Sequence, residues 1–102
     1  MHPAIAQHTS EISSICQRFH IKRLEVFGSA ARASDFNPET SDADFLVEFT
    51  SDADHGLQTF FGAKAALESV LGRGVDLIES GAVKNPFVLA SINAHKEPVY
   101  AA

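Results

Sequence analysis

Helical and strand-like segments alternate along the chain, and this order restricts the possible folds more than any other feature. Apolar residues recur at helical spacing or gather in short runs with strand character. The helical segments are residues 5–19, 29–33, 55–71 and 86–95, and the strand-like segments are 21–28, 44–49 and 75–79. A short extended stretch, "PVY", follows the last helix. Because helices separate all the strands, the order predicts an α/β (α+β) fold, a small β-sheet with helices packed on it, and leaves parallel or mixed topology open.

The size of the chain indicates one small domain spanning residues 1–102. The 102 residues are 45% hydrophobic, and Gly and Pro punctuate the sequence without clustering into a linker. A chain of this length buries a modest core and has little surface left for an elaborate pocket. We therefore expect partner subunits to complete what the domain lacks.

Charge and cysteine content exclude several classes of protein. The formal net charge of −5 argues against general binding to nucleic-acid backbones, although an acidic site can hold phosphates that metal ions bridge. The single cysteine, Cys16, excludes an internal disulfide and is expected in the core. No apolar run approaches the roughly 18 residues of a membrane span. These features predict a cytoplasmic protein with neither a membrane nor a nucleic acid as a partner.

Two aspartates stand at the start of an apolar strand, in "TSDADFLVEF". Strand geometry would place Asp42 and Asp44 on the same side, about 7 Å apart at roughly 3.3 Å per residue. Such carboxylates repel each other unless cations lie between them, and Mg²⁺ prefers hard oxygen ligands of this kind. The alternative is that Asp42 lies in a loop and that both side chains are merely solvated. A second pair, Asp52-x-Asp54, does not enter an apolar strand and is assigned to a solvated helix start.

Two further features fit phosphate chemistry without requiring it. Asp76 lies in the apolar run "GVDLIE" and is either a third metal ligand or an exposed residue of an edge strand. In "VFGSAAR", Gly28 ends a strand and Ser29 begins a helix, so backbone amides and a hydroxyl can receive phosphate oxygens. Arg32, one turn further, could meet the same phosphates or an acidic neighbour. Most Gly-Ser pairs are ordinary turns.

In combination, "VFGSAAR", "SDADFLVEF" and "GRGVDLI" resemble the nucleotidyltransferase superfamily of the DNA polymerase beta type. Within it the chain looks most like the minimal nucleotidyltransferases, the small antitoxins encoded beside HEPN-domain toxins. The matching order of helices extends the resemblance over nearly the whole chain. It implies the polymerase beta-like fold, with a mixed sheet.

The resemblance also implies roles for individual residues. Asp42, Asp44 and Asp76 would hold two Mg²⁺ ions, with Asp76 completing the ion that activates the acceptor hydroxyl. The residues that would bind the nucleotide are Gly28, Ser29, Arg32 and Ser41, and Ser29 would share in catalysis.

The expected function is a Mg²⁺-dependent transfer of AMP from ATP to a hydroxyl, with release of pyrophosphate. The resemblance implies that the acceptor is a tyrosine of a HEPN ribonuclease toxin, which forms a hetero-oligomer with this chain and is neutralised by the modification. One alternative is a binding antitoxin without catalysis. Another is a transferase acting on a small molecule, which the expected lack of a second domain disfavours.

Overall fold

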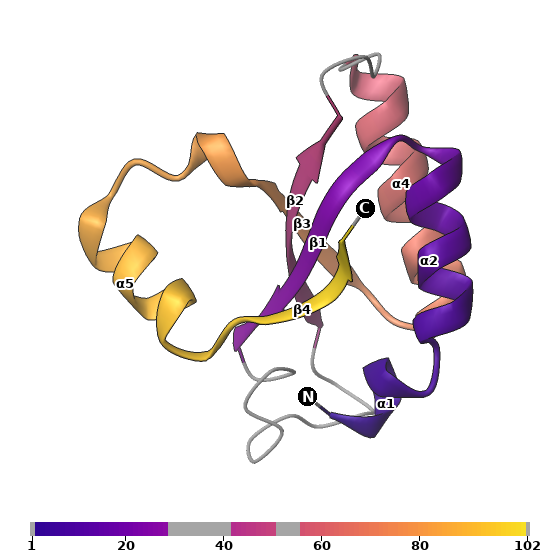
Figure 1. The fold of residues 1–102 in the computed structure, drawn as a ribbon, viewed down its shortest axis with the longest axis horizontal. Coiled ribbons are helices and arrows are strands. Elements are labelled where there is room, and N and C mark those ends of the chain that lie inside the picture. Colours follow the sequence, from indigo (N-terminus) through magenta and orange to yellow (C-terminus); the bar gives the residue numbers. More distant parts are fainter. Residues whose placement is uncertain (1, 29–41, 51–55, 102) are drawn as a thin grey trace.

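The computed structural model describes residues 2–28, 42–50 and 56–101 (Figure 1). Its elements are α1 (Pro3–Ala6), α2 (Thr9–Arg18), β1 (Ile21–Phe27), β2 (Ala43–Phe49), α4 (Leu57–Leu71), β3 (Val75–Glu79), the 3-10 helix η1 (Ser80–Ala82), α5 (Pro86–His95) and β4 (Glu97–Ala101). The helix expected at residues 29–33 and the Asp52-x-Asp54 pair lie outside the described residues. None of the described helices is long and apolar enough to cross a membrane.

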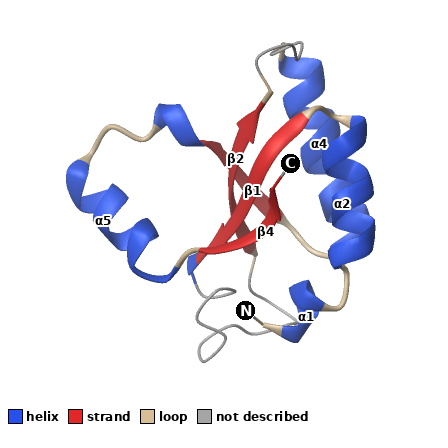
Figure 2. Cartoon of the chain, viewed as in Figure 1, coloured by secondary structure: helices blue, strands red, loops and turns tan. Residues whose placement is uncertain are grey.

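The strands form one mixed sheet in the order β3-β2-β1-β4. Figure 2 shows this sheet with helices on both sides of it. β1 pairs antiparallel with both β2 and β4, whereas β2 and β3 pair in parallel. Parallel neighbours need a long crossover connection, and α4 lies in it. The expected small mixed sheet with helices is thus confirmed, and the stretch "PVY" proves to lie in a paired strand.

The first helical segment is broken into α1 and α2. Pro3 begins α1, and the ring of His2 accepts a hydrogen bond from the Ala4 amide at 3.0 Å, which caps this short helix. A second start follows at Thr9.

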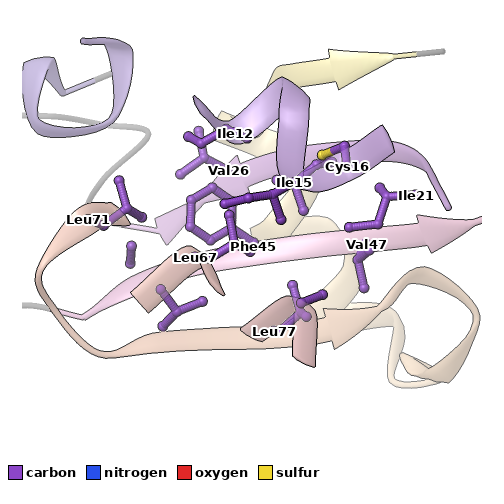
Figure 3. Close-up of a cluster of buried hydrophobic side chains, with 14 of the residues drawn as sticks. Ile12, Ile15, Cys16, Ile21, Val26, Phe45, Val47, Leu67, Leu71 and Leu77 are labelled. Atoms are coloured by element: carbon purple, nitrogen blue, oxygen red, sulfur yellow. The ribbon is translucent and has the colours of Figure 1, made fainter. Parts of the chain in front are cut away.

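The core lies between one face of the sheet and the helices α2 and α4 (Figure 3). β2 alternates as predicted, with Phe45 and Val47 buried towards the helices, while Leu67 and Ile12 reach them from α4 and α2. Among the described residues no polar or charged residue is buried. The opposite face of the sheet, on the side of α5 (Figure 1), carries Asp44 and Glu48 of β2 together with a few apolar residues, and Leu46 of β2 and Ile92 of α5 are buried there.

Cys16 is fully buried in this core, as expected. Because it is buried, it should make the protein less stable at alkaline pH. Burial raises the pKa of its thiol from 9.0 to about 12. Between these values the unfolded chain loses the thiol proton and the folded chain keeps it. The stabilisation is therefore complete below pH 9 and is lost as the pH rises towards 12, by about 1.4 kcal/mol per pH unit.

Urea unfolding between pH 8 and 11 tests this dependence when the wild type is compared with Cys16→Ala. The variant loses the thiol but keeps every other titrating group, so the difference between the two unfolding free energies isolates Cys16. We expect this difference to change with pH. A constant difference across the range would contradict the prediction.

Candidate functional site

The ends of three strands meet at one end of the sheet. β1 ends at Phe27, and its antiparallel partner β2 begins beside it, so Phe27 pairs with Asp44. β3 runs parallel to β2 and begins at the same end, which pairs Asp44 with Asp76. Phe27, Asp44 and Asp76 therefore form a row across the sheet, which we call the carboxylate row. Gly28 directly follows this row, and Asp42 directly precedes β2.

Asp44 and Asp76 lie side by side on the face of the sheet opposite α2 and α4. Neighbouring strands lie about 4.8 Å apart, and in-register residues point to the same side. Asp44 is partly buried, and Asp76 is exposed. Like charges directly opposite each other on a sheet repel, and a cation bound between them removes this penalty.

Each aspartate of the Asp-x-Asp pair packs closely against a glycine. A Cβ atom added to Gly28 would lie 2.5 Å from Oδ2 of Asp44, and one added to Gly74 would lie 2.6 Å from Oδ1 of Asp42. Gly28 has a φ of +67°, so its left-handed backbone favours glycine as well. The two carboxylates thus lean to opposite sides of β2, one towards β1 and the other towards β3.

The sequence did not single out Gly74. The signal for it is the glycine directly before an apolar strand in "GRGVDLI", because a strand glycine often marks a close approach of other atoms.

The start of β3 is held in place by two hydrogen bonds. The Ala43 amide donates to the Gly74 carbonyl at 3.0 Å, which ties β3 to β2. The Val75 amide donates to Oε2 of Glu68, on α4, at 3.2 Å. Together these two hydrogen bonds fix the register of β3 against β2, and this register places Asp76 beside Asp44. Glu68 is a second residue that the sequence did not single out, because its partner is an amide seven residues away.

The aspartates fit a divalent cation in ligand type and in backbone position. Carboxylate oxygens are the ligands that Mg²⁺ prefers, and Asp44 and Asp76 come from two adjacent strands, with Asp42 directly before the first of them. In the part of the chain that the structure describes, however, no group of three or more His, Cys, Asp or Glu residues is already arranged to hold a metal ion. Asp42 lies one residue before β2 and leans towards Gly74, so its carboxylate must turn to share an ion with Asp44.

The remaining predicted site residues are placed only by the sequence. Ser29, Arg32 and Ser41 lie outside the described residues. Gly28 is described and directly follows β1, beside the carboxylate row. The structure thus brings together Gly28, Asp44 and Asp76, with Asp42 nearby but turned towards Gly74, and the roles of all seven residues stay predictions.

Comparison with known proteins identifies relatives that match most of this sequence. A family model described as "Nucleotidyltransferase domain" matches residues 10–99. "Putative protein adenylyltransferase MJ0128" of Methanocaldococcus jannaschii is 40% identical over 76 residues, which are 74% of this chain and 74% of the relative.

Solved structures share the fold as well. The structure of a "putative minimal nucleotidyltransferase" matches with a TM-score of 0.75 and 29% identity, over 96% of both chains. A chain from a complex of tri-AMPylated Shewanella oneidensis HEPN toxin with MNT antitoxin matches with a TM-score of 0.64 and 14% identity, over 95% of this chain and 72% of the other. The family match over most of the chain, together with the sheet that bears the carboxylate row, shows that this protein belongs to the nucleotidyltransferase domain family.

Proposed function

We propose that this nucleotidyltransferase moves AMP from ATP to a hydroxyl group of another protein and uses Mg²⁺ to do so. The observation that carries the proposal is the pairing of Asp44 with Asp76 at the end of the sheet where Gly28 leaves β1. This end offers carboxylates for metal ions and, beside them, a glycine turn of the kind that lets phosphates approach the backbone. The relatives named as protein adenylyltransferases support a protein acceptor.

Some residues of the chain would bind Mg²⁺, and others would bind the phosphates of ATP and position them for transfer. Asp42, Asp44 and Asp76 would hold Mg²⁺, which when bound neutralises phosphate charge and makes the acceptor hydroxyl more acidic. Gly28 and Ser29 would receive the β- and γ-phosphates and keep the α-phosphorus in line with the acceptor. The acceptor oxygen forms a bond to the α-phosphorus, the bond from that phosphorus to the bridging oxygen breaks, and pyrophosphate leaves. The hydroxyl proton passes to water at the exposed end of the row, beside Asp76.

We infer further that the acceptor is a tyrosine of a HEPN ribonuclease toxin and that the modification neutralises it. The motifs "VFGSAAR" and "SDADFLVEF" and the shared fold with a chain of a complex between an AMPylated HEPN toxin and an MNT antitoxin support this partner. The buried free thiol of Cys16 is compatible with a reducing compartment, so we place the reaction in the cytoplasm.

Incubation with labelled ATP, Mg²⁺ and the HEPN toxin proposed as the partner tests the proposal. We expect label on the toxin and loss of its ribonuclease activity with the wild type, and neither with the variant Asp42→Ala/Asp44→Ala. Unlabelled toxin that the double variant still neutralises would instead indicate a binding antitoxin without catalysis. In a parallel incubation with a small molecule such as an aminoglycoside, labelling of that molecule but not of the toxin would indicate a small-molecule transferase.

A further inference from the structure

An apolar pocket of about 380 Å³ lies next to the carboxylate row, between the sheet and α5. Its lining comes from the sheet end, with Phe27, Gly28 and Ile78, and from α5, with Phe87, Val88, Ser91 and Ile92. α5 stands on the side of the sheet opposite α2 and α4 (Figure 1). The pocket therefore opens over the face that bears the aspartates and not into the core.

The pocket and the carboxylate row share one surface. Phe27 belongs to the row itself, since it pairs with Asp44. Ile78 follows Asp76 by two residues on β3, so the two side chains point to the same face. A molecule whose charged part lies at the row can therefore place an adjoining part in the pocket.

The lining of the pocket suits a flat, uncharged group. None of the lining residues carries a charge, and a desolvated phosphate would be unfavourable there. Phe27 and Phe87 provide aromatic rings, and Ser91 provides one side-chain hydroxyl that can both donate and accept a hydrogen bond. The volume lies within the usual range for small-molecule sites, which is about 300–1,000 Å³.

The start of α5 leaves apolar surface uncovered at the mouth of this pocket. Phe87 is 84% exposed and Val88 is 45% exposed. The backbone beneath them is nevertheless fixed, because Oδ1 of Asn85 accepts hydrogen bonds from the Phe87 amide at 2.9 Å and from the Val88 amide at 3.4 Å. A held aromatic ring with a free face is suited to stacking.

We propose that this pocket binds the base of the donor nucleotide, with Phe87 stacked on the ring and Ser91 hydrogen-bonded to its edge. The inference rests on the proposed function and adds the place where the nucleoside part is recognised. The base is the one uncharged, aromatic part of a nucleoside triphosphate, and the ribose links it to phosphates that would lie at Gly28 and Asp44. An acceptor side chain has no such link to the row, so the base fits the position better.

Binding of ATP and of inorganic tripolyphosphate to the full chain, each with Mg²⁺, tests the pocket. Phe87→Ala is expected to weaken ATP binding about tenfold, as the loss of one base–aromatic stack does, and to leave tripolyphosphate binding unchanged. Ser91→Trp places a bulky side chain in the pocket from an exposed helix position and is expected to act in the same way. The control is Phe61→Ala, which removes another exposed phenylalanine from α4, outside the pocket.

The outcomes separate the pocket from the function on which it rests. Unchanged ATP affinity in both Phe87→Ala and Ser91→Trp would overturn the base pocket alone. If these variants keep the ATP affinity but transfer less label to the protein acceptor, the pocket serves the acceptor and the inference is wrong. A wild type that binds neither ATP nor tripolyphosphate would overturn the proposed function and the pocket together.

Discussion

Asp76→Asn is expected to lower the rate of AMP transfer about a thousandfold while ATP still binds. In the proposed reaction Asp76 acts on the acceptor side, whereas Asp44 lies next to Gly28 and the phosphates. Losing about 4 kcal/mol of metal-based charge stabilisation corresponds to a rate about a thousandfold lower. Single-turnover transfer and ATP titration measure the two effects separately. Asp44→Asn should impair both.

Asp76→Asn should also stabilise the fold when Mg²⁺ is absent. Asp44 and Asp76 are in-register neighbours of like charge, and removing one charge relieves a repulsion of about 0.2–1 kcal/mol. Chelator-treated Asp76→Asn should therefore unfold at a higher temperature than the wild type. Glu79→Gln removes a charge from the same strand outside the row and is the control. Full activity of Asp76→Asn at saturating Mg²⁺ would rule out the assigned role.

Gly74→Ala is expected to lower the Mg²⁺ concentration needed for transfer by up to about tenfold, because it displaces the Asp42 carboxylate from the position out of which it must turn to share an ion with Asp44. The added methyl group would meet Oδ1 of Asp42 at 2.6 Å, so the carboxylate must move. Asp42 is exposed and its oxygen is the far end of a side chain, so this movement should change the stability of the fold by less than about 0.5 kcal/mol. Mg²⁺ titration of activity and thermal unfolding measure the two quantities.

Two other glycines provide matched controls for this substitution. A methyl group at Gly81 meets no atom within 4 Å, so Gly81→Ala should change neither quantity. A methyl group at Gly62 would lie 2.8 Å from Cε1 of Phe19, so Gly62→Ala should shift the unfolding temperature but not the Mg²⁺ requirement. If Gly74→Ala behaves like either control, Gly74 does not position Asp42.

Local patterns in the sequence predicted most of the fold, because each pattern reports a nearby physical requirement. The apolar alternation of β2 reflects one buried face, and Asn85-Pro86 marks the start of α5 through its own hydrogen bonds. The pairing of β4 with β1 joins residues more than 70 positions apart, as Glu97 with Val26 shows. No local pattern carries such information, and "PVY" therefore read only as an extended end.

The candidate site divides in the same way. The sequence predicted that Asp42 and Asp44 share a side and offered Asp76 as a third metal ligand or as an exposed residue of an edge strand. In the structure β3, which carries Asp76, lies beside β2. The sequence could not predict that Asp42 leans away towards Gly74, because that contact depends on where β3 begins. The sequence could not predict the role of Glu68 for a related reason. An acidic residue on a helix is expected to be solvated, and its hydrogen bond from the Val75 amide depends on where β3 begins.

The position of β3 as the outer strand of the described sheet bears on what the enzyme can accept. Asp76 lies at the margin of the sheet, with no further described strand beyond it, and its side chain is exposed. In the proposed reaction, the acceptor hydroxyl can therefore approach Asp76 from the open edge of β3 as well as from above the sheet.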